Sequence, residues 1–173
     1  MMHTFATLTL IAMLGVAVVF DLRTRRIPNV LTVTGLLVAL ALRAGAGTGS
    51  LMAGLAGAGI ALALTFPLVM LGGLGGGDAK LLAAVGGFLG PGSLPTALLV
   101  TALTGGAMAL VLALRRGVLG ETLAHGRDLI TGLAPGSAGR AGRARTRTIH
   151  TPGAMAIPYG VAITIGGLAG WFT

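Results

Sequence analysis

Cysteine is absent from this chain of 173 residues, and acidic side chains are scarce. The absence of cysteine excludes disulfides, a thiol nucleophile and a cysteine-based zinc site. The three histidines are scattered and lie outside the apolar runs, so we expect no metal site. Only four side chains are acidic, and they are Asp21, Asp78, Glu121 and Asp128.

Charged residues of either sign are also rare. They make up 9% of the chain, against about 25% in soluble domains, whereas 54% of the residues are hydrophobic and the mean hydropathy is +0.94. This composition indicates an integral membrane protein with a single domain over residues 1–173. The net charge of +8 is explained by membrane topology, so we expect no binding to nucleic acid.

Six apolar segments predict an all-α, polytopic fold with about six transmembrane helices. A spanning helix needs about 20 apolar residues, and the fourth segment is too short to span comfortably. The first segment lacks a basic start and a small-residue cleavage site, so we expect a retained helix rather than a signal peptide. The segments cover residues 4–20, 30–42, 51–71, 77–90, 95–114 and 153–172.

The basic residues predict the orientation. With the N-terminus outside, every lysine and arginine except Arg43 falls on the cytoplasmic side, as the positive-inside rule requires. Phe5, Trp171 and Phe172 then mark the far interface. The basic loop at residues 115–151 is expected to contain an amphipathic helix on the inner leaflet and to attract anionic lipid.

Asp21 and Asp78 are the candidate functional residues, because ionisable groups at the ends of membrane helices are costly and by default functional. Both fall on the cytoplasmic side in this topology. Two adjacent carboxylates share a proton and activate a water. Asp78 begins a helix, where the dipole favours an anion, and Asp21 ends one. We therefore hypothesise that Asp78 is the ionised member of the pair and Asp21 the proton carrier.

The residues around these aspartates resemble the motifs of the type IV prepilin peptidases. Asp-Leu-Arg-Thr-Arg-Arg-Ile-Pro-Asn at residues 21–29 is similar to their first motif, and Gly-Gly-Gly-Asp-Ala-Lys at residues 75–80 to their second, Gly-x-Gly-Asp-x-Lys. Pro-Tyr-Gly at residues 158–160 resembles a weaker third feature. The resemblance implies that Asp21 and Asp78 are catalytic. The neighbours expected to bind substrate or support the pair are Arg23, Pro28, Asn29, Gly75, Gly77, Lys80, Pro158, Tyr159 and Gly160.

The same resemblance implies an aspartic endopeptidase that needs no cofactor. Its substrate would be a prepilin, cleaved after a glycine at the cytoplasmic face of the bacterial inner membrane, and components of pilus or secretion assembly are expected partners. The larger family members carry paired cysteines and an N-methyltransferase activity. Because this chain has no cysteine, it resembles the small, peptidase-only subgroup that serves tight-adherence (Flp) pili.

The two aspartates are also compatible with roles outside catalysis. Asp21 would serve as a helix-end partner of Arg23 or Arg25, and Asp78 as a helix N-cap. Together they are also suited to a proton or cation relay in a small transporter. A non-catalytic assembly subunit would require neither carboxylate.

Overall fold

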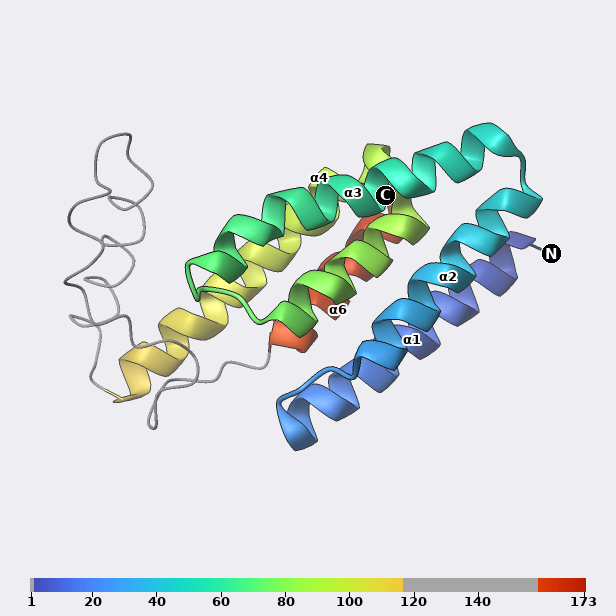
Figure 1. Ribbon diagram of the computed structural model, residues 1–173. Helices are drawn as coiled ribbons and strands as arrows, with labels where there is room; N and C mark the ends of the chain where they lie inside the picture. Colours follow the sequence, from blue (N-terminus) through green and yellow to red (C-terminus); the bar gives the residue numbers. More distant parts are fainter. Residues whose placement is uncertain (1, 117–158) are drawn as a thin grey trace, which may run out of the picture.

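The computed structural model describes residues 2–116 and 159–173, and all regular elements in these two parts are α-helices, as predicted (Figure 1). The basic loop and the amphipathic helix expected within residues 115–151 lie almost entirely outside the described residues. The helices are α1 (Met2–Thr24), α2 (Asn29–Gly45), α3 (Thr48–Met70), α4 (Gly76–Arg116) and α6 (Tyr159–Phe172).

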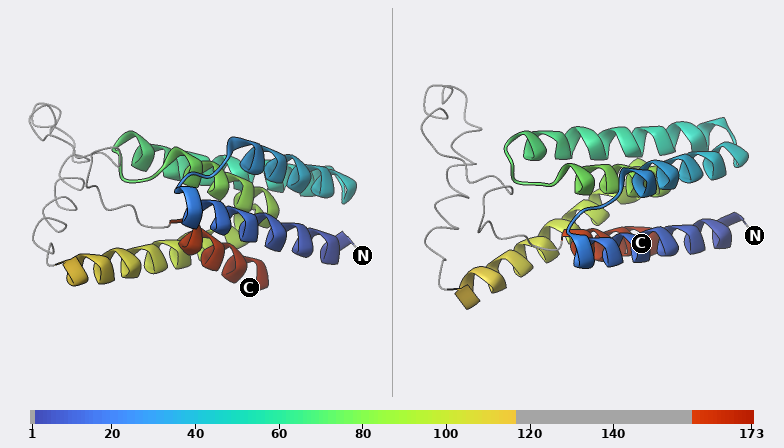
Figure 2. Two further views of the ribbon diagram at one scale, coloured as in Figure 1. Left: turned by 90° about the horizontal axis from the view of Figure 1, so that it is seen from below. Right: turned by 60° about the horizontal axis from the view of Figure 1, so that its bottom comes forward.

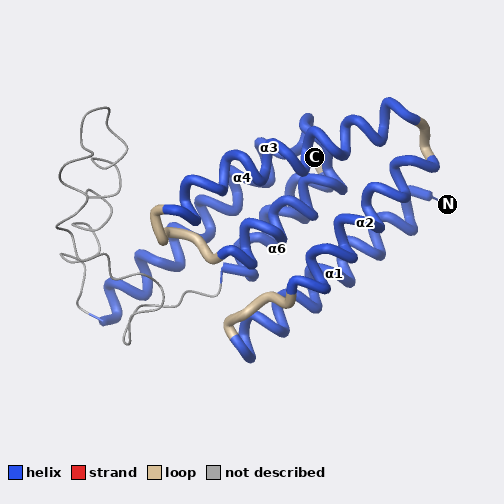
Figure 3. The backbone as a smooth tube through the Cα atoms, in the orientation of Figure 1, coloured by secondary structure: helices blue, strands red, loops and turns tan. Residues whose placement is uncertain are grey.

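Short loops join the first four helices into an up-and-down arrangement (Figure 3). Helix α4 lies at the centre, because it packs against α1, α2, α3 and α6. The views in Figure 2 show α1 and α6 side by side, so the two ends of the described chain meet in one bundle.

Three helices are long and apolar enough to cross a membrane: His3–Thr24, Thr48–Met70 and Gly76–Leu112. Helices α2 and α6 are apolar but shorter. The chain is therefore a membrane protein. The count of six crossings and the outward N-terminus stay predictions.

Helix α4 is interrupted at Gly90, whose φ of 73° and ψ of −179° are not helical. This break separates the predicted segments 77–90 and 95–114, although the second part begins at Pro91 and not at residue 95. Proline suits the first position of a helix, because its missing N–H has no partner there and its φ is already helical. Because the helix breaks at Gly90 and a new helical part starts at Pro91, the part of α4 before the break is short.

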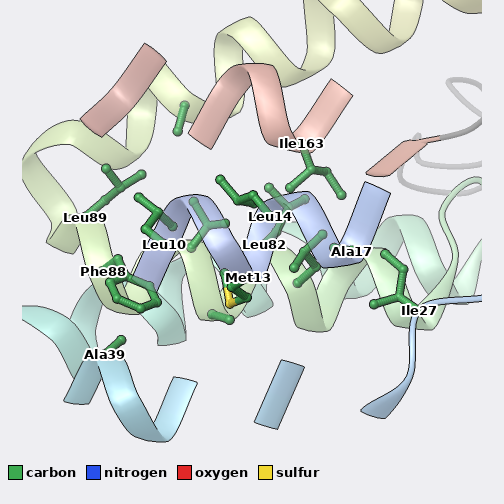
Figure 4. Packing of buried hydrophobic residues seen from close by; sticks show 14 of the residues in the cluster. Leu10, Met13, Leu14, Ala17, Ile27, Ala39, Leu82, Phe88, Leu89 and Ile163 are labelled. Atoms are coloured by element: carbon green, nitrogen blue, oxygen red, sulfur yellow. The ribbon is translucent and has the colours of Figure 1, made fainter. Parts of the chain in front are cut away.

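A layer of leucines, alanines and isoleucine fills the space between α1, α4 and α6 (Figure 4). Leu10 and Leu14 of α1 are fully buried against this layer, as is Ile163 of α6. Because helix association in lipid depends on close packing rather than on exclusion of water, the shapes of these faces determine the stability of the bundle.

Glycines allow α3 and α4 to pack backbone against backbone. A Cβ added at Gly86 would lie 2.5 Å from the carbonyl oxygen of Gly57, and one added at Gly57 would meet the backbone of Gly86 and Gly90. A Cβ added at Gly59, on the same helix α3, would meet no atom within 4 Å beyond its chain neighbours and the adjacent backbone of its own helix. Gly57 and Gly86 are therefore packing glycines, whereas Gly59 faces outward.

Gly57→Ala is expected to destabilise the fold by about 1–3 kcal/mol, because an added methyl group forces α3 away from α4. The matched change Gly59→Ala is expected to be neutral or stabilising by up to about 1 kcal/mol, since alanine favours the helix. Unfolding in detergent monitored by circular dichroism measures both. Equal effects of the two changes would contradict this packing role.

Candidate active site

Asp21 lies in the last turn of α1 and is 6% exposed. Helix α1 continues for three residues beyond it, to Thr24, although the predicted apolar segment ends at residue 20. Arg25 then adopts a left-handed conformation with φ of 52° and donates its N–H to the Asp21 carbonyl at 2.9 Å. A non-glycine residue in this conformation costs about 1–2 kcal/mol, so the turn after Asp21 is held by its surroundings.

The Asp21 carboxylate accepts a hydrogen bond of 2.7 Å from the backbone N–H of Gly160. Gly160 lies in the first turn of α6, so the positive end of that helix faces the carboxylate. A Cβ at Gly160 would lie 2.8 Å from Asp21 Oδ2 and 3.0 Å from its Cβ. Only glycine leaves room for this approach.

This contact removes the physical basis for giving the two aspartates different roles. Asp21 does end one helix, but its carboxylate also meets the N-terminus of another. Asp78 lies in the first turn of α4. Helix ends therefore do not distinguish the two residues, and the assignment of Asp21 as proton carrier loses its physical reason.

Asp78 is partly buried beside the loop that joins α3 to α4. Its carboxylate lies close to the backbone of Gly75. A Cβ at Gly75 would lie 2.7 Å from Asp78 Oδ2, whereas one at Gly76 would have no neighbour within 4 Å. The first glycine of the Gly-x-Gly-Asp motif thus makes space for the carboxylate, and the next position is unconstrained.

The second glycine of the motif joins the two aspartate segments. A Cβ at Gly77 would lie 3.3 Å from the Cβ of Ile27 and 3.4 Å from its carbonyl oxygen. Ile27 is buried in the turn that leads from α1 to α2. The first turn of α4 therefore packs directly against the segment that follows Asp21, a contact that the sequence did not reveal.

A polar link also joins the two segments, because Lys80 Nζ donates a hydrogen bond of 2.9 Å to Asn29 Oδ1. Both residues are exposed, so the bond itself adds little stability. The structure thus places Lys80 against Asn29. Pro28, the residue before Asn29, is the N-cap of α2 and has a φ of −62°.

Asp21 and Asp78 lie close enough to interact electrostatically, and Tyr159 interacts with Asp78 in the same way. Arg25 acts on Asp21 through its charge; Arg23 and Arg25 are both exposed. Pro158 lies outside the described residues. The described residues hold no group of three or more metal-ligating side chains. The candidate site thus gathers two carboxylates and a tyrosine at one end of the bundle.

Tyr159 is positioned by the second part of α4. A Cβ at Gly105 would lie 3.0–3.2 Å from atoms of the Tyr159 ring, so the ring rests on the backbone there. Ile27 and Gly105 are supporting residues that the sequence did not single out, whereas Arg25 was expected as a possible partner of Asp21. The only feature of the sequence that could have drawn attention to Ile27 is its position inside the first motif. No feature of the sequence marks Gly105.

Fold and site together define a helical membrane protein with two carboxylates gathered at one end of its bundle. The chain belongs to the type IV leader peptidase family, whose model matches residues 8–110 and so includes Asp21 and Asp78. No curated protein and no solved structure matches the chain. Membership of this family makes the protein a peptidase of the leader-peptidase type.

Gly75→Ala is expected to lower peptidase activity at least tenfold. The new methyl group would overlap the Asp78 carboxylate and displace it. Small misplacements of groups in active sites lower reaction rates by as much as about 100-fold. Gly76→Ala is the matched control and should retain activity, since its methyl group meets nothing. Rates of precursor cleavage at equal amounts of folded protein measure both. Full activity of Gly75→Ala would contradict the proposed placement of Asp78.

Proposed function

We propose that this protein is a membrane aspartic endopeptidase that removes the leader peptide of type IV, Flp-like prepilins at the cytoplasmic face of the inner membrane. The observation that carries the proposal is the packing of the first turn of α4, which holds Asp78, against the segment that follows Asp21, because it brings to one end of the bundle two of only four acids in the chain. Family membership supports the reaction class, and N-methylation is not part of the proposal.

The proposed reaction uses one proton shared by the pair. Two close carboxylates resist joint ionisation, so one stays protonated. The ionised carboxylate takes a proton from a water, which attacks the scissile carbonyl, while the protonated carboxyl donates to the carbonyl oxygen. The backbone N–H of Gly160 holds the Asp21 carboxylate, and the backbone at Gly75 lies against the Asp78 carboxylate.

The cytoplasmic location is supported by the basic residues that surround the pair. Arg23, Arg25 and Arg26 follow Asp21, and Lys80 follows Asp78. By the positive-inside rule, this end of the bundle faces the cytoplasm. A prepilin leader would reach the carboxylates from that side, with anionic inner-leaflet lipid near the basic loop and pilus or secretion components as further partners.

Asp21→Asn and Asp78→Asn are each expected to abolish cleavage, with losses of at least about 100-fold, the low end of what acid–base catalysis contributes. An amide cannot exchange the proton that the mechanism requires, yet it preserves the shape of the side chain. The assay co-expresses the full chain with a small Flp-type prepilin and follows the precursor by gel shift and N-terminal sequencing.

The control is Thr24→Val, which removes an exposed hydroxyl that bonds only to backbone carbonyls near the end of α1 and should leave cleavage unchanged. Cleavage by either asparagine variant at the wild-type rate would overturn the carboxylate pair. Failure of folded wild type on several prepilins would favour the transporter hypothesis instead.

The pH dependence of kcat/KM is expected to be bell-shaped. Activity falls at low pH, where both carboxylates are protonated and no base remains, and it falls at high pH, where the shared proton is lost and no acid remains. Initial rates across a pH series on purified enzyme and a prepilin peptide measure this. A profile that stays flat while the protein remains folded would contradict a shared proton.

A further inference from the structure

A cavity of about 470 Å³ lies at the end of the bundle opposite to the two aspartates. It is lined by the start of α1, the end of α2, the start of α3, the middle of α4 and the end of α6. Asp21 lies 18 residues from His3 along α1, which places the two ends of the bundle roughly 27 Å apart. The lining includes His3, Arg43, Ser50, Phe88, Ser93 and Trp171.

Arg43 is the permanent cation of this cavity. Its Nη2 donates to the carbonyl oxygen of Phe88 at 2.8 Å, and its Nη1 donates to the carbonyl and hydroxyl oxygens of Ser50 at 3.2 and 3.4 Å. Its Nε is buried and has no hydrogen-bond partner in the described parts of the chain. All these acceptors of the guanidinium are neutral.

No side-chain carboxylate of the described residues balances this charge. The acids of the described residues are Asp21 and Asp78, and both lie at the far end of the bundle. The guanidinium is only partly buried, and a guanidinium is well suited to phosphate oxygens. Arg43 therefore makes this cavity a site for an anion.

The surroundings of Arg43 favour a lipid over a free ion. Arg43 lies in the last turn of α2 and Trp171 in the last turn of α6, and the ends of membrane helices lie at the level of the lipid headgroups. Ala39, Leu42 and Leu89 form an apolar wall beside the cation, and Figure 4 shows Ala39 and Leu89 near Phe88. A phosphate next to an apolar wall is the arrangement of a phospholipid.

We propose that this cavity binds an anionic phospholipid, with its phosphate at Arg43 and the start of an acyl chain along the wall formed by Ala39, Leu42 and Leu89. The described lining offers no carboxylate to the ammonium group of a zwitterionic lipid. Phosphatidylglycerol, whose headgroup has no cation, therefore fits better than phosphatidylcholine. The site is independent of the proposed peptidase reaction.

The test uses the full chain in detergent and measures Tm and native mass spectra with dioleoyl phosphatidylglycerol, dioleoyl phosphatidylcholine or inorganic phosphate. Phosphatidylglycerol at about 100 times its Kd is expected to raise Tm by roughly 5–10 °C and to remain bound as one molecule. Arg43→Gln should weaken this binding about tenfold or more, since a hydrogen bond to a charged group is lost.

Ala6→Phe keeps every hydrogen bond of Arg43 and fills the cavity from α1, so it should weaken lipid binding even if Arg43→Gln fails to fold. Arg26→Gln removes one exposed positive charge at the other end and should bind like wild type. Equal binding of phosphatidylcholine, equal protection by inorganic phosphate, or unchanged binding by Ala6→Phe would each overturn the proposal.

Discussion

The hydrogen bond from the Gly160 amide to the Asp21 carboxylate joins parts of the chain that are 139 residues apart. It fixes the end of α1 to the start of α6, and α6 in turn packs along α4, which presents Asp78. Since a buried carboxylate without a partner is costly, this contact also makes burial of Asp21 tolerable. The relative placement of the two carboxylates thus depends on where α6 begins.

Glycine makes this convergence sterically possible. Gly75, Gly77 and Gly160 each stand where a Cβ would crowd Asp78, Ile27 or Asp21 respectively. The unconstrained Gly76 between the first two shows that the pattern is specific and is not a consequence of a glycine-rich chain. The Gly-x-Gly-Asp spacing is therefore explained by two separate contacts, one to the carboxylate and one to the neighbouring segment.

Much of the fold could be predicted because membrane helices leave strong signals. The length of each apolar run predicts the helices and the separation of α4 into two parts, and Asp21 and Asp78 stand out because acids are rare. The Gly160 contact and the packing of Ile27 on Gly77 could not be predicted, since they depend on how distant helices dock. In the sequence Arg43 is notable only as the one base expected on the outer side. Its role could not be predicted, because its hydrogen-bond acceptors are backbone carbonyls and a serine on other helices.

The break at Gly90 relates the two ends of the molecule to each other. Gly90 is not helical, so the helix that carries Asp78 ends there, and Arg43 donates to the carbonyl of Phe88 at that terminus, where a cation suits the dipole. The part of α4 before the break covers about 21 Å at 1.5 Å per residue, less than the roughly 30 Å of the hydrocarbon core. If its far end lies at the interface, as the position of Arg43 predicts, its first turn is expected to lie below the opposite membrane surface. Helix α6 has 14 residues and is equally short, and its first turn meets Asp21 through Gly160, one turn before the end of the longer α1. Two short helices beside a longer one thus explain why the first turns of α4 and α6 lie at the level of Asp21 and not beyond the end of α1.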